Sequence, residues 1–310
     1  MSGYPDTDSS SFSLKMRQRA PCLTWGILPN LVRVIRTAPR VVLNLKEEEM
    51  IDRRNAAISG RPYALVVLWV GLMIPASLLM RLLQDEIGFP YEILPFVMLG
   101  PLVAGIICRL VVPSWFPNDA PRASSVLFAR AWMGLALVIA LCAIGTFTLM
   151  KSGNLSFVPK GWSGPFAFAT VIVGQTIGAW CEEAGFRGVM YRALSAKLRP
   201  WACILINGLF FGLCHIQYFK GGVVAVAAFM ASTVLIVSVM AFLWVGSWTQ
   251  RLLMCGAFHA VVNITQELRG ADEQEMSTHL ASLAVVTICA VAAYALGKAL
   301  RVGEIGSQAR

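Results

Sequence analysis

Two carboxylates and a guanidinium group lie close together in one apolar stretch of the chain, the segment Glu182-Glu183-Ala184-Gly185-Phe186-Arg187. The sequence on either side is apolar enough for the interior of a membrane. An ionisable side chain at that depth costs about 2.5 to 3.5 kcal/mol on insertion scales, so charged residues there indicate a functional site. A carboxylate in such surroundings is a candidate general base, which takes a proton from a reacting group.

Helical spacing gives the two carboxylates different roles. Glu183 and Arg187 are four residues apart with the acid nearer the N-terminus, the order that pairs best on one helix face. Glu182 points about 100° away from Glu183 around the helix, so it faces another neighbour. The sequence therefore favours Glu182 as the base and Glu183 as a partner that positions the site. The alternative is a buried ion-pair network that only holds helices together.

Two of the three histidines, His215 and His259, lie in later apolar segments. His259 and Asn263 are four residues apart, so they emerge one turn apart on one helix face and form a two-donor surface. Two such donors suit the oxyanion that develops on a carbonyl group. Phe211 and His215 share a face by the same spacing, and we expect His215 to meet Glu182 while Phe211 walls the site against lipid. Either pair alone would more often be interhelical glue, but two histidines and two carboxylates in neighbouring segments favour chemistry.

The composition places these side chains in a polytopic membrane protein. Of 310 residues, 57% are hydrophobic and 14% are charged, whereas about a quarter of the residues of soluble domains are charged. A membrane span needs about 20 mostly apolar residues. We therefore predict an all-α polytopic membrane protein with about eight transmembrane helices, seven being the main alternative, and a polar active site inside the bundle. The predicted spans are Tyr63–Leu83, Ile93–Val112, Ala131–Met150, Phe166–Val189, Trp201–Ile216, Val223–Val245, Leu252–Ile264 and Leu280–Leu296.

Basic residues near the ends of alternate spans predict the topology. Lys and Arg are enriched in cytoplasmic loops. They cluster before the first predicted span, after the second and after the fourth, whereas acidic residues dominate most of the other loops. Both termini are therefore predicted to be cytoplasmic. The same distribution accounts for the net charge of +9 without a nucleic-acid partner, because the basic residues form no stripe interleaved with aromatic residues.

We divide the chain into three parts. Residues 1–62 are a cytoplasmic basic segment, in which residues 31–45 would suit an interfacial amphipathic helix, a disordered tail being the alternative. Residues 63–297 are the membrane-embedded domain, and residues 298–310 are a short cytoplasmic tail.

Three motifs in this order resemble the CAAX protease and bacteriocin-processing family of intramembrane glutamate proteases, which includes the CAAX prenyl endopeptidases. Each motif is weak alone, but their order on successive apolar segments is specific and covers residues 166–296. Ala184 and Gly185 replace the bulkier residues often found after the paired glutamates, a change that removes no functional group. The motifs are Glu182-Glu183-x-x-x-Arg187, Phe211-x-x-x-His215 and His259-x-x-x-Asn263.

The resemblance implies an intramembrane endopeptidase in which Glu182, helped by His215, deprotonates a water molecule that attacks a peptide carbonyl. His259 and Asn263 would hold the oxyanion, and Glu183 would orient the site. No metal or organic cofactor is implied. The expected partners are membrane lipid and a peptide or membrane-protein substrate, of which a prenylated CaaX tail is one candidate. The bacterial cytoplasmic membrane is our first expectation for the compartment, and the endoplasmic reticulum is the second.

Other functions remain open at this stage. Two histidines and a glutamate could bind zinc, although a His-Glu-x-x-His motif is absent. A thiol protease is conceivable because Cys181, Cys214 and Cys255 lie near the motif residues, but buried thiols in apolar surroundings are usually inert. A non-catalytic membrane scaffold with the same fold is an alternative from a different class. A transporter is disfavoured, since no Gly or Pro interruption recurs symmetrically in two halves.

Overall fold

The computed structural model describes residues 61–149, 165–269 and 275–304. Within these ranges the chain is helical and contains no strand, so the prediction of an all-α fold is confirmed. Every predicted span overlaps a helix. The helices are α2 (Arg61–Ile87), α3 (Gly100–Val111), α4 (Ser125–Leu149), α5 (Pro165–Gly185), α6 (Arg192–Ser195), α7 (Pro200–Leu213), α8 (Gly222–Leu243), α9 (Trp248–Arg269) and α10 (Met276–Leu300), with short helical turns at Phe96–Leu99, Pro113–Trp115 and Ile216–Gly221. The predicted basic segment with its interfacial helix lies outside the described residues, except that Arg61 and Pro62 begin α2.

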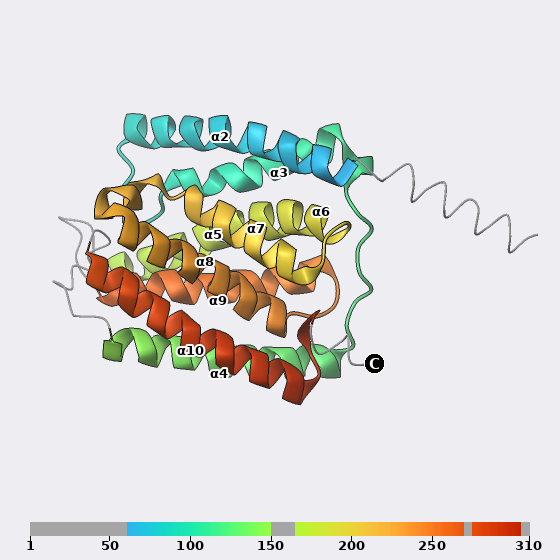
Figure 1. Ribbon diagram of the computed structural model, residues 1–310. Helices are drawn as coiled ribbons and strands as arrows, with labels where there is room; N and C mark the ends of the chain where they lie inside the picture. Colours follow the sequence, from blue (N-terminus) through green and yellow to red (C-terminus); the bar gives the residue numbers. More distant parts are fainter. Residues whose placement is uncertain (1–60, 150–164, 270–274, 305–310) are drawn as a thin grey trace, which may run out of the picture. The chain divides into compact units, whose positions relative to one another are not determined.

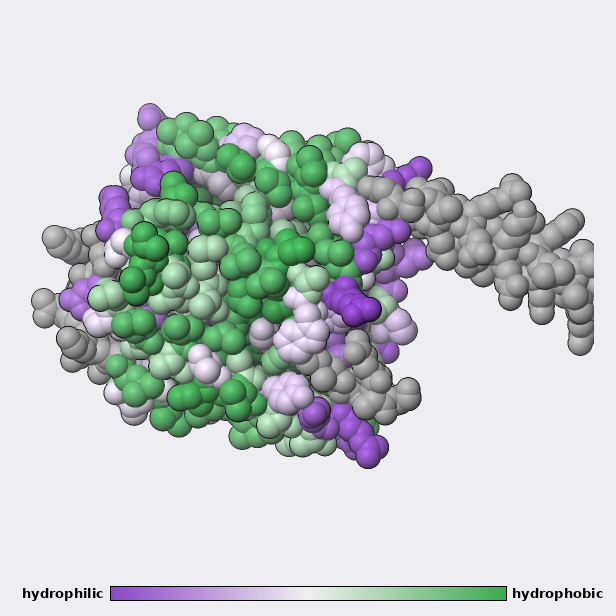
Figure 2. All heavy atoms as spheres, viewed as in Figure 1, coloured by the Kyte–Doolittle hydropathy of each residue, from purple (hydrophilic) through white to green (hydrophobic). Residues whose placement is uncertain are grey.

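The outer surface of the helical domain is suited to lipid. Within the described ranges, four segments are long and apolar enough to cross a membrane: α2, α4, the run Ile216–Leu243 that contains α8, and α10. Figure 2 shows apolar residues over the middle of the visible face and hydrophilic residues gathered at its two ends. Large apolar side chains such as Leu110 and Val291 are exposed, an arrangement that water would oppose and hydrocarbon would not. The protein is therefore an integral membrane protein.

The helices run up and down, with successive long helices in opposite directions (Figure 1). α2 and α3 lie along one flank of this domain, α4 and α10 lie along the opposite flank, and α5, α7, α8 and α9 lie between them. α5 packs against α3 and α9, while α7 packs against α8. This arrangement places α5 and α9, which carry the polar motifs, between the two flanking helix pairs.

The α5 helix changes its winding directly after the paired glutamates. A π-helical stretch, Phe186–Tyr191, follows Gly185 and leads into the short α6. Five of its six residues are buried. π-Helical turns are rare inside α-helices and are found frequently at functional sites. Here the change from α-helical to π-helical winding comes after Glu183, and Arg187 is the second residue of the π-helical stretch.

Close packing brings α5 and α9 together at a glycine. A Cβ atom on Gly256 of α9 would collide with the indole ring of Trp180 on α5. Only a residue without a side chain fits at this crossing, and small residues at such contacts let membrane helices approach closely. The crossing lies two residues before Glu182 and three before His259, so it sets the distance between their helices.

The structure corrects the expected end of the fifth span. α7 has 14 residues, or about 21 Å at 1.5 Å per residue, and it ends at Leu213 rather than Ile216. His215 therefore lies just beyond α7, with non-helical φ and ψ of −90° and 62°. The Phe211 carbonyl oxygen, which a continuing α-helix would bond to the His215 amide, is instead 2.9 Å from His215 Nδ1. The side chain thus takes the place of the backbone donor where the helix ends.

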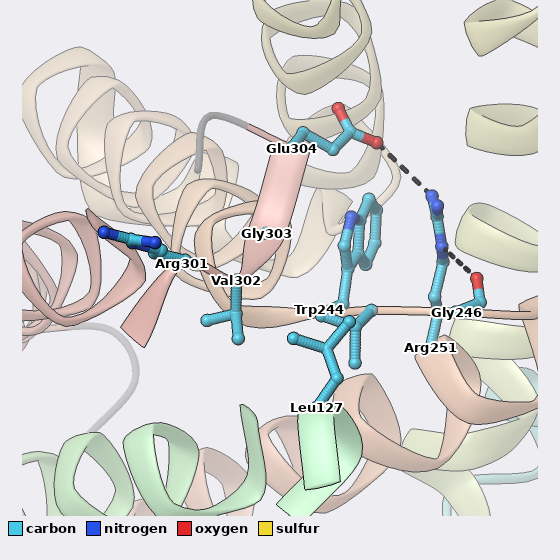
Figure 3. Close-up of a pocket in the computed structure, with 9 residues that line it drawn as sticks. Leu127, Trp244, Gly246, Arg251, Arg301, Val302, Gly303 and Glu304 are labelled. Carbon is cyan, nitrogen blue, oxygen red and sulfur yellow. Dashed lines mark hydrogen bonds and ion pairs between the residues drawn. The ribbon is translucent and has the colours of Figure 1, made fainter. Parts of the chain in front are cut away.

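A polar network joins the segment after α10 to the end of the π-helical stretch and to the first turn of α9. Tyr191 donates its hydroxyl hydrogen to Glu304 Oε2 at 3.0 Å, and Arg251 Nη1 lies 3.4 Å from Glu304 Oε1. Figure 3 shows Glu304 facing Arg251, whose Nε donates to the Gly246 carbonyl oxygen. Burial raises the pKa of Glu304, while Arg251 and Tyr191 act in the opposite direction. A cavity of about 290 Å³ adjoins this network, and none of the predicted site residues lines it.

Replacement of Glu304 is expected to loosen this end of the domain. In a Glu304→Ala variant, Arg251 and the Tyr191 hydroxyl lose their shared acceptor, and hydrogen bonds that involve charged groups are worth about 1.5 to 3 kcal/mol. The variant should unfold at a lower temperature in detergent. Lys298→Ala is the matched control, since Lys298 is exposed near the end of α10 and its ammonium group lies 4.8 Å from the centroid of the Tyr294 ring. An unchanged Tm in Glu304→Ala would mean that the network adds no stability.

Candidate active site

Glu183 and Arg187 form the ion pair that their spacing predicts. Arg187 Nε lies 3.1 Å from Glu183 Oε2, and both side chains are fully buried. A charge in such a place is tolerated only with a partner of opposite sign. Glu182, the preceding residue, is 7% exposed.

His259 on α9 connects the two carboxylates. Its Nδ1 lies 2.7 Å from Glu183 Oε1, and its Nε2 lies 3.6 Å from Glu182 Oε2. An ionised carboxylate only accepts hydrogen bonds, so Glu183 next to Arg187 places a proton on Nδ1 of His259. Arg187, Glu183, His259 and Glu182 therefore form one continuous chain of charged and polar contacts. A carboxylate behind a histidine fixes the tautomer and the orientation of the ring, as the aspartate does in Ser-His-Asp triads.

His215 is oriented by its own backbone and by aromatic neighbours. The Phe211 carbonyl can only accept, so the 2.9 Å contact assigns the proton to His215 Nδ1 and leaves Nε2 as an acceptor. The ring lies parallel to Tyr218 at 5.8 Å and packs against Phe229 at 5.2 Å. We expected His215 to meet Glu182, but among the described residues no hydrogen bond joins them, and Glu182 faces His259 instead.

Phe211 lies at the centre of the site. Its ring contacts His215 at 4.7 Å and His259 at 5.6 Å between ring centroids. The Arg187 guanidinium lies over the same ring, 5.0 Å from its centroid. Phe211 is 3% exposed, so it packs the three motifs against one another and is less a wall against lipid than we expected.

Asn263 lies one turn beyond His259 on α9 and is partly buried. The four-residue spacing predicts that its carboxamide and the imidazole share one helix face. Its carboxamide forms no hydrogen bond to another described side chain or backbone group. The role of Asn263 as an oxyanion donor stays a prediction.

Comparison with known proteins places these motifs in a family. Residues 162–265 match the family described as type II CAAX prenyl endopeptidase Rce1-like. This confirms the resemblance. The matched segment is about one third of the chain, runs from just before α5 into α9, and holds all seven predicted site residues.

The chain is also similar in sequence to curated proteins. Lysostaphin resistance protein A from Staphylococcus aureus strains bovine RF122 / ET3-1, Newman and USA300 is 24% identical over 166 residues. The alignment covers 52% of this chain. The chain spans 39% of the length of these relatives.

The Rce1-like segment also contains a polar residue that our sequence reasoning missed. Asn207 on α7 is fully buried, and its Nδ2 donates to the Phe186 carbonyl oxygen at 2.8 Å. One signal was available, because Asn207, Phe211 and His215 follow one another at intervals of four residues. An asparagine in an otherwise apolar helix is also uncommon enough to deserve notice.

The alternative functions, a thiol protease and a zinc protease, would need a reactive cysteine or a cluster of metal-binding side chains. Cys181 and Cys255 are buried and Cys214 is exposed, and all three thiols are free. Across residues 61–149, 165–269 and 275–304, no group of three His, Cys, Asp or Glu side chains has the geometry to hold a metal ion.

Proposed function

We propose that the protein is an intramembrane endopeptidase that hydrolyses a peptide bond of a membrane-associated peptide or protein. The observation that carries this proposal is the contact chain from Arg187 through Glu183 and His259 to Glu182. The Rce1-like match to the same segment supports it independently. These contacts link the buried charges of α5 to His259 on α9, the arrangement that the proposed reaction needs.

The proposed reaction uses Glu182 as the base. Glu182 accepts one proton from a water molecule while the water oxygen attacks the peptide carbonyl carbon. His215 Nε2, left as an acceptor by the contact with Phe211, helps to orient that water molecule. General acid–base catalysis by one positioned group contributes about 10² to 10⁴-fold to such a reaction.

The oxyanion and the leaving group complete the proposal. In the proposed step His259 carries a proton on both ring nitrogens, so Nδ1–H donates to Glu183. Its Nε2–H and the Asn263 carboxamide then donate to the carbonyl oxygen as it becomes negative. When the carbon–nitrogen bond breaks, Glu182 returns its proton to the departing amine. The products are a carboxylic acid and an amine, which ionise to a carboxylate and an ammonium group in water, and one water molecule is consumed. No metal ion or organic cofactor takes part in this proposal.

We also propose the orientation, the compartment and the substrate class. The up-and-down order of the helices brings the loops before α4, before α7 and before α9 to the same end (Figure 1), where Arg122, Arg199 and Arg251 lie. The excess of basic residues favours a cytoplasmic location for this end. The bacterial cytoplasmic membrane is the proposed compartment, ahead of the endoplasmic reticulum, and a prenylated CaaX tail is one candidate substrate.

Mass spectrometry of protein amino termini tests the function and identifies the substrate together. Cells of the source organism that lack the protein would be complemented with the wild type, with Glu182→Gln, or with Glu86→Gln as a control for an exposed carboxylate. We expect new amino termini near membrane boundaries with the wild type and the control, and their loss with Glu182→Gln. If all three strains share the same amino termini while Glu182→Gln still restores the cellular phenotype, the protein is a scaffold instead.

A further inference from the structure

The π-helical turn after the paired glutamates is held by a residue from another helix. Phe186 begins this turn, and its carbonyl oxygen accepts a hydrogen bond from Asn207 Nδ2 at 2.8 Å. A π-helix pairs residues five apart instead of four, so it rotates the residues that follow relative to those before. Arg187 is the next residue after Phe186, so its direction depends on how the turn is wound.

The hydrogen bond to the Phe186 carbonyl is the one polar contact that explains an asparagine at position 207 of the described structure. Asn207 is fully buried on α7, and within Pro200–Leu213 it is the one carboxamide side chain. Its Oδ1 has no hydrogen-bond partner among the described residues. Burying a carboxamide whose oxygen has no hydrogen-bond partner costs free energy. The hydrogen bond from Nδ2 to the Phe186 carbonyl oxygen is therefore the contact that accounts for an asparagine at this position.

The contact leads directly to the predicted catalytic residues. The Phe186 ring packs edge-on against the Phe211 ring at 4.8 Å, and the Arg187 guanidinium lies over the same Phe211 ring, 5.0 Å from its centroid. Arg187 in turn pairs with Glu183, which bonds His259. A change in the winding at Phe186 is therefore passed to His259 through two polar contacts.

We infer that Asn207 is a positioning residue: through the Phe186 carbonyl it fixes the π-helical turn that points Arg187 at Glu183 and thereby sets the His259 ring. The inference rests on the proposed protease function for its catalytic consequence. Its structural half, that Asn207 holds the turn, does not depend on that function.

A matched control lies at the next residue of α7, Gly208, on the interface between α7 and α8. Thr233 on α8 is buried, and its hydroxyl donates to the Gly208 carbonyl oxygen at 2.9 Å. This bond also ties a side chain to a backbone carbonyl, yet it holds α7 to α8 and does not touch the π-helical turn. Asn207→Leu and Thr233→Val each remove one such donor with little change in volume.

Two measurements on full-length protein in lipid nanodiscs test the inference. The first is cleavage of the substrate found by the amino-terminal comparison, per folded protein and well below the Tm of each variant. A misplacement of about 1 Å can cost on the order of 10²-fold, so we expect kcat to fall about that much in Asn207→Leu with little change in KM. Thr233→Val should keep a kcat within about twofold of wild type, since a small stability loss alone does not move it.

The second measurement is amide hydrogen exchange of residues 186–195, which needs no activity. We expect faster exchange there in Asn207→Leu than in Thr233→Val. Equal exchange and equal kcat in the two variants would overturn the inference. If wild type and Glu182→Gln are both inactive, the protease function fails while the exchange result still decides whether Asn207 holds the turn. If Asn207→Leu does not fold, Asn207→Ser, which is polar but too short to reach, takes its place with the same expected results.

Discussion

Glu182→Gln is expected to abolish cleavage while leaving the protein folded. Glutamine has the shape of glutamate but cannot take a proton from water at neutral pH, so the loss should be about 10² to 10⁴-fold in kcat. Glu182 lies 3.6 Å from His259 Nε2 and belongs to no shorter ion pair, so the amide should be accommodated. The measurement is the rate of cleavage by purified protein in nanodiscs, together with its Tm.

Glu86→Gln controls for a general effect of carboxylate loss. Glu86 is exposed near the end of α2, and its replacement should change neither cleavage nor Tm. Cleavage by Glu182→Gln at the wild-type rate would exclude Glu182 as the base. It would also favour a different nucleophile, such as a thiol, which replacement of Cys181, Cys214 and Cys255 would then test.

Glu183→Ala is expected to prevent normal folding, although the residue is next to Glu182 in the chain. The change leaves the Arg187 guanidinium fully buried with no carboxylate at 3.1 Å, and it removes the 2.7 Å partner of His259 Nδ1. Breaking a buried ion pair by removing one partner costs about 3 to 5 kcal/mol. We expect little monodisperse protein by size-exclusion chromatography and a strongly lowered Tm for what remains.

A double variant separates the loss of stability from the loss of activity. Glu183→Met combined with Arg187→Met removes both charges, and apolar replacement of a buried pair is often neutral for stability. The double variant should recover much of the lost Tm but stay inactive, because nothing then orients His259 through Nδ1. A Glu183→Ala protein as stable as wild type would show that the buried pair is dispensable for folding.

Several features of the site could be predicted from the sequence because they depend on one helix. The Glu183–Arg187 pair follows from a spacing of four residues, and so does the position of Asn263 one turn beyond His259. The divergence of Glu182 and Glu183 follows from the 100° step of the helix. In the structure both carboxylates contact His259, each at a different ring nitrogen, and this shared partner was not predicted.

The composition also determined the class of fold. A chain in which apolar residues dominate over lengths of about 20 residues can satisfy its backbone in hydrocarbon only as helices or closed barrels. All eight predicted spans overlap helices in the structure. The least accurate boundary was at His215, where a side-chain hydrogen bond to the Phe211 carbonyl ends the helix early.

What the sequence determined by itself is therefore local: which segments are helical, which residues share a helix face, and which motifs match the Rce1-like family. Only the tertiary structure decided which ring nitrogen of His259 meets which glutamate, that Phe211 lies between Arg187 and both histidines, and that Asn207 and Glu304 hold the two ends of the π-helical segment. Helical periodicity reports the direction of a side chain around its own axis. It carries no information on the rotation or height of the neighbouring helix, which close packing at contacts such as Gly256 with Trp180 sets.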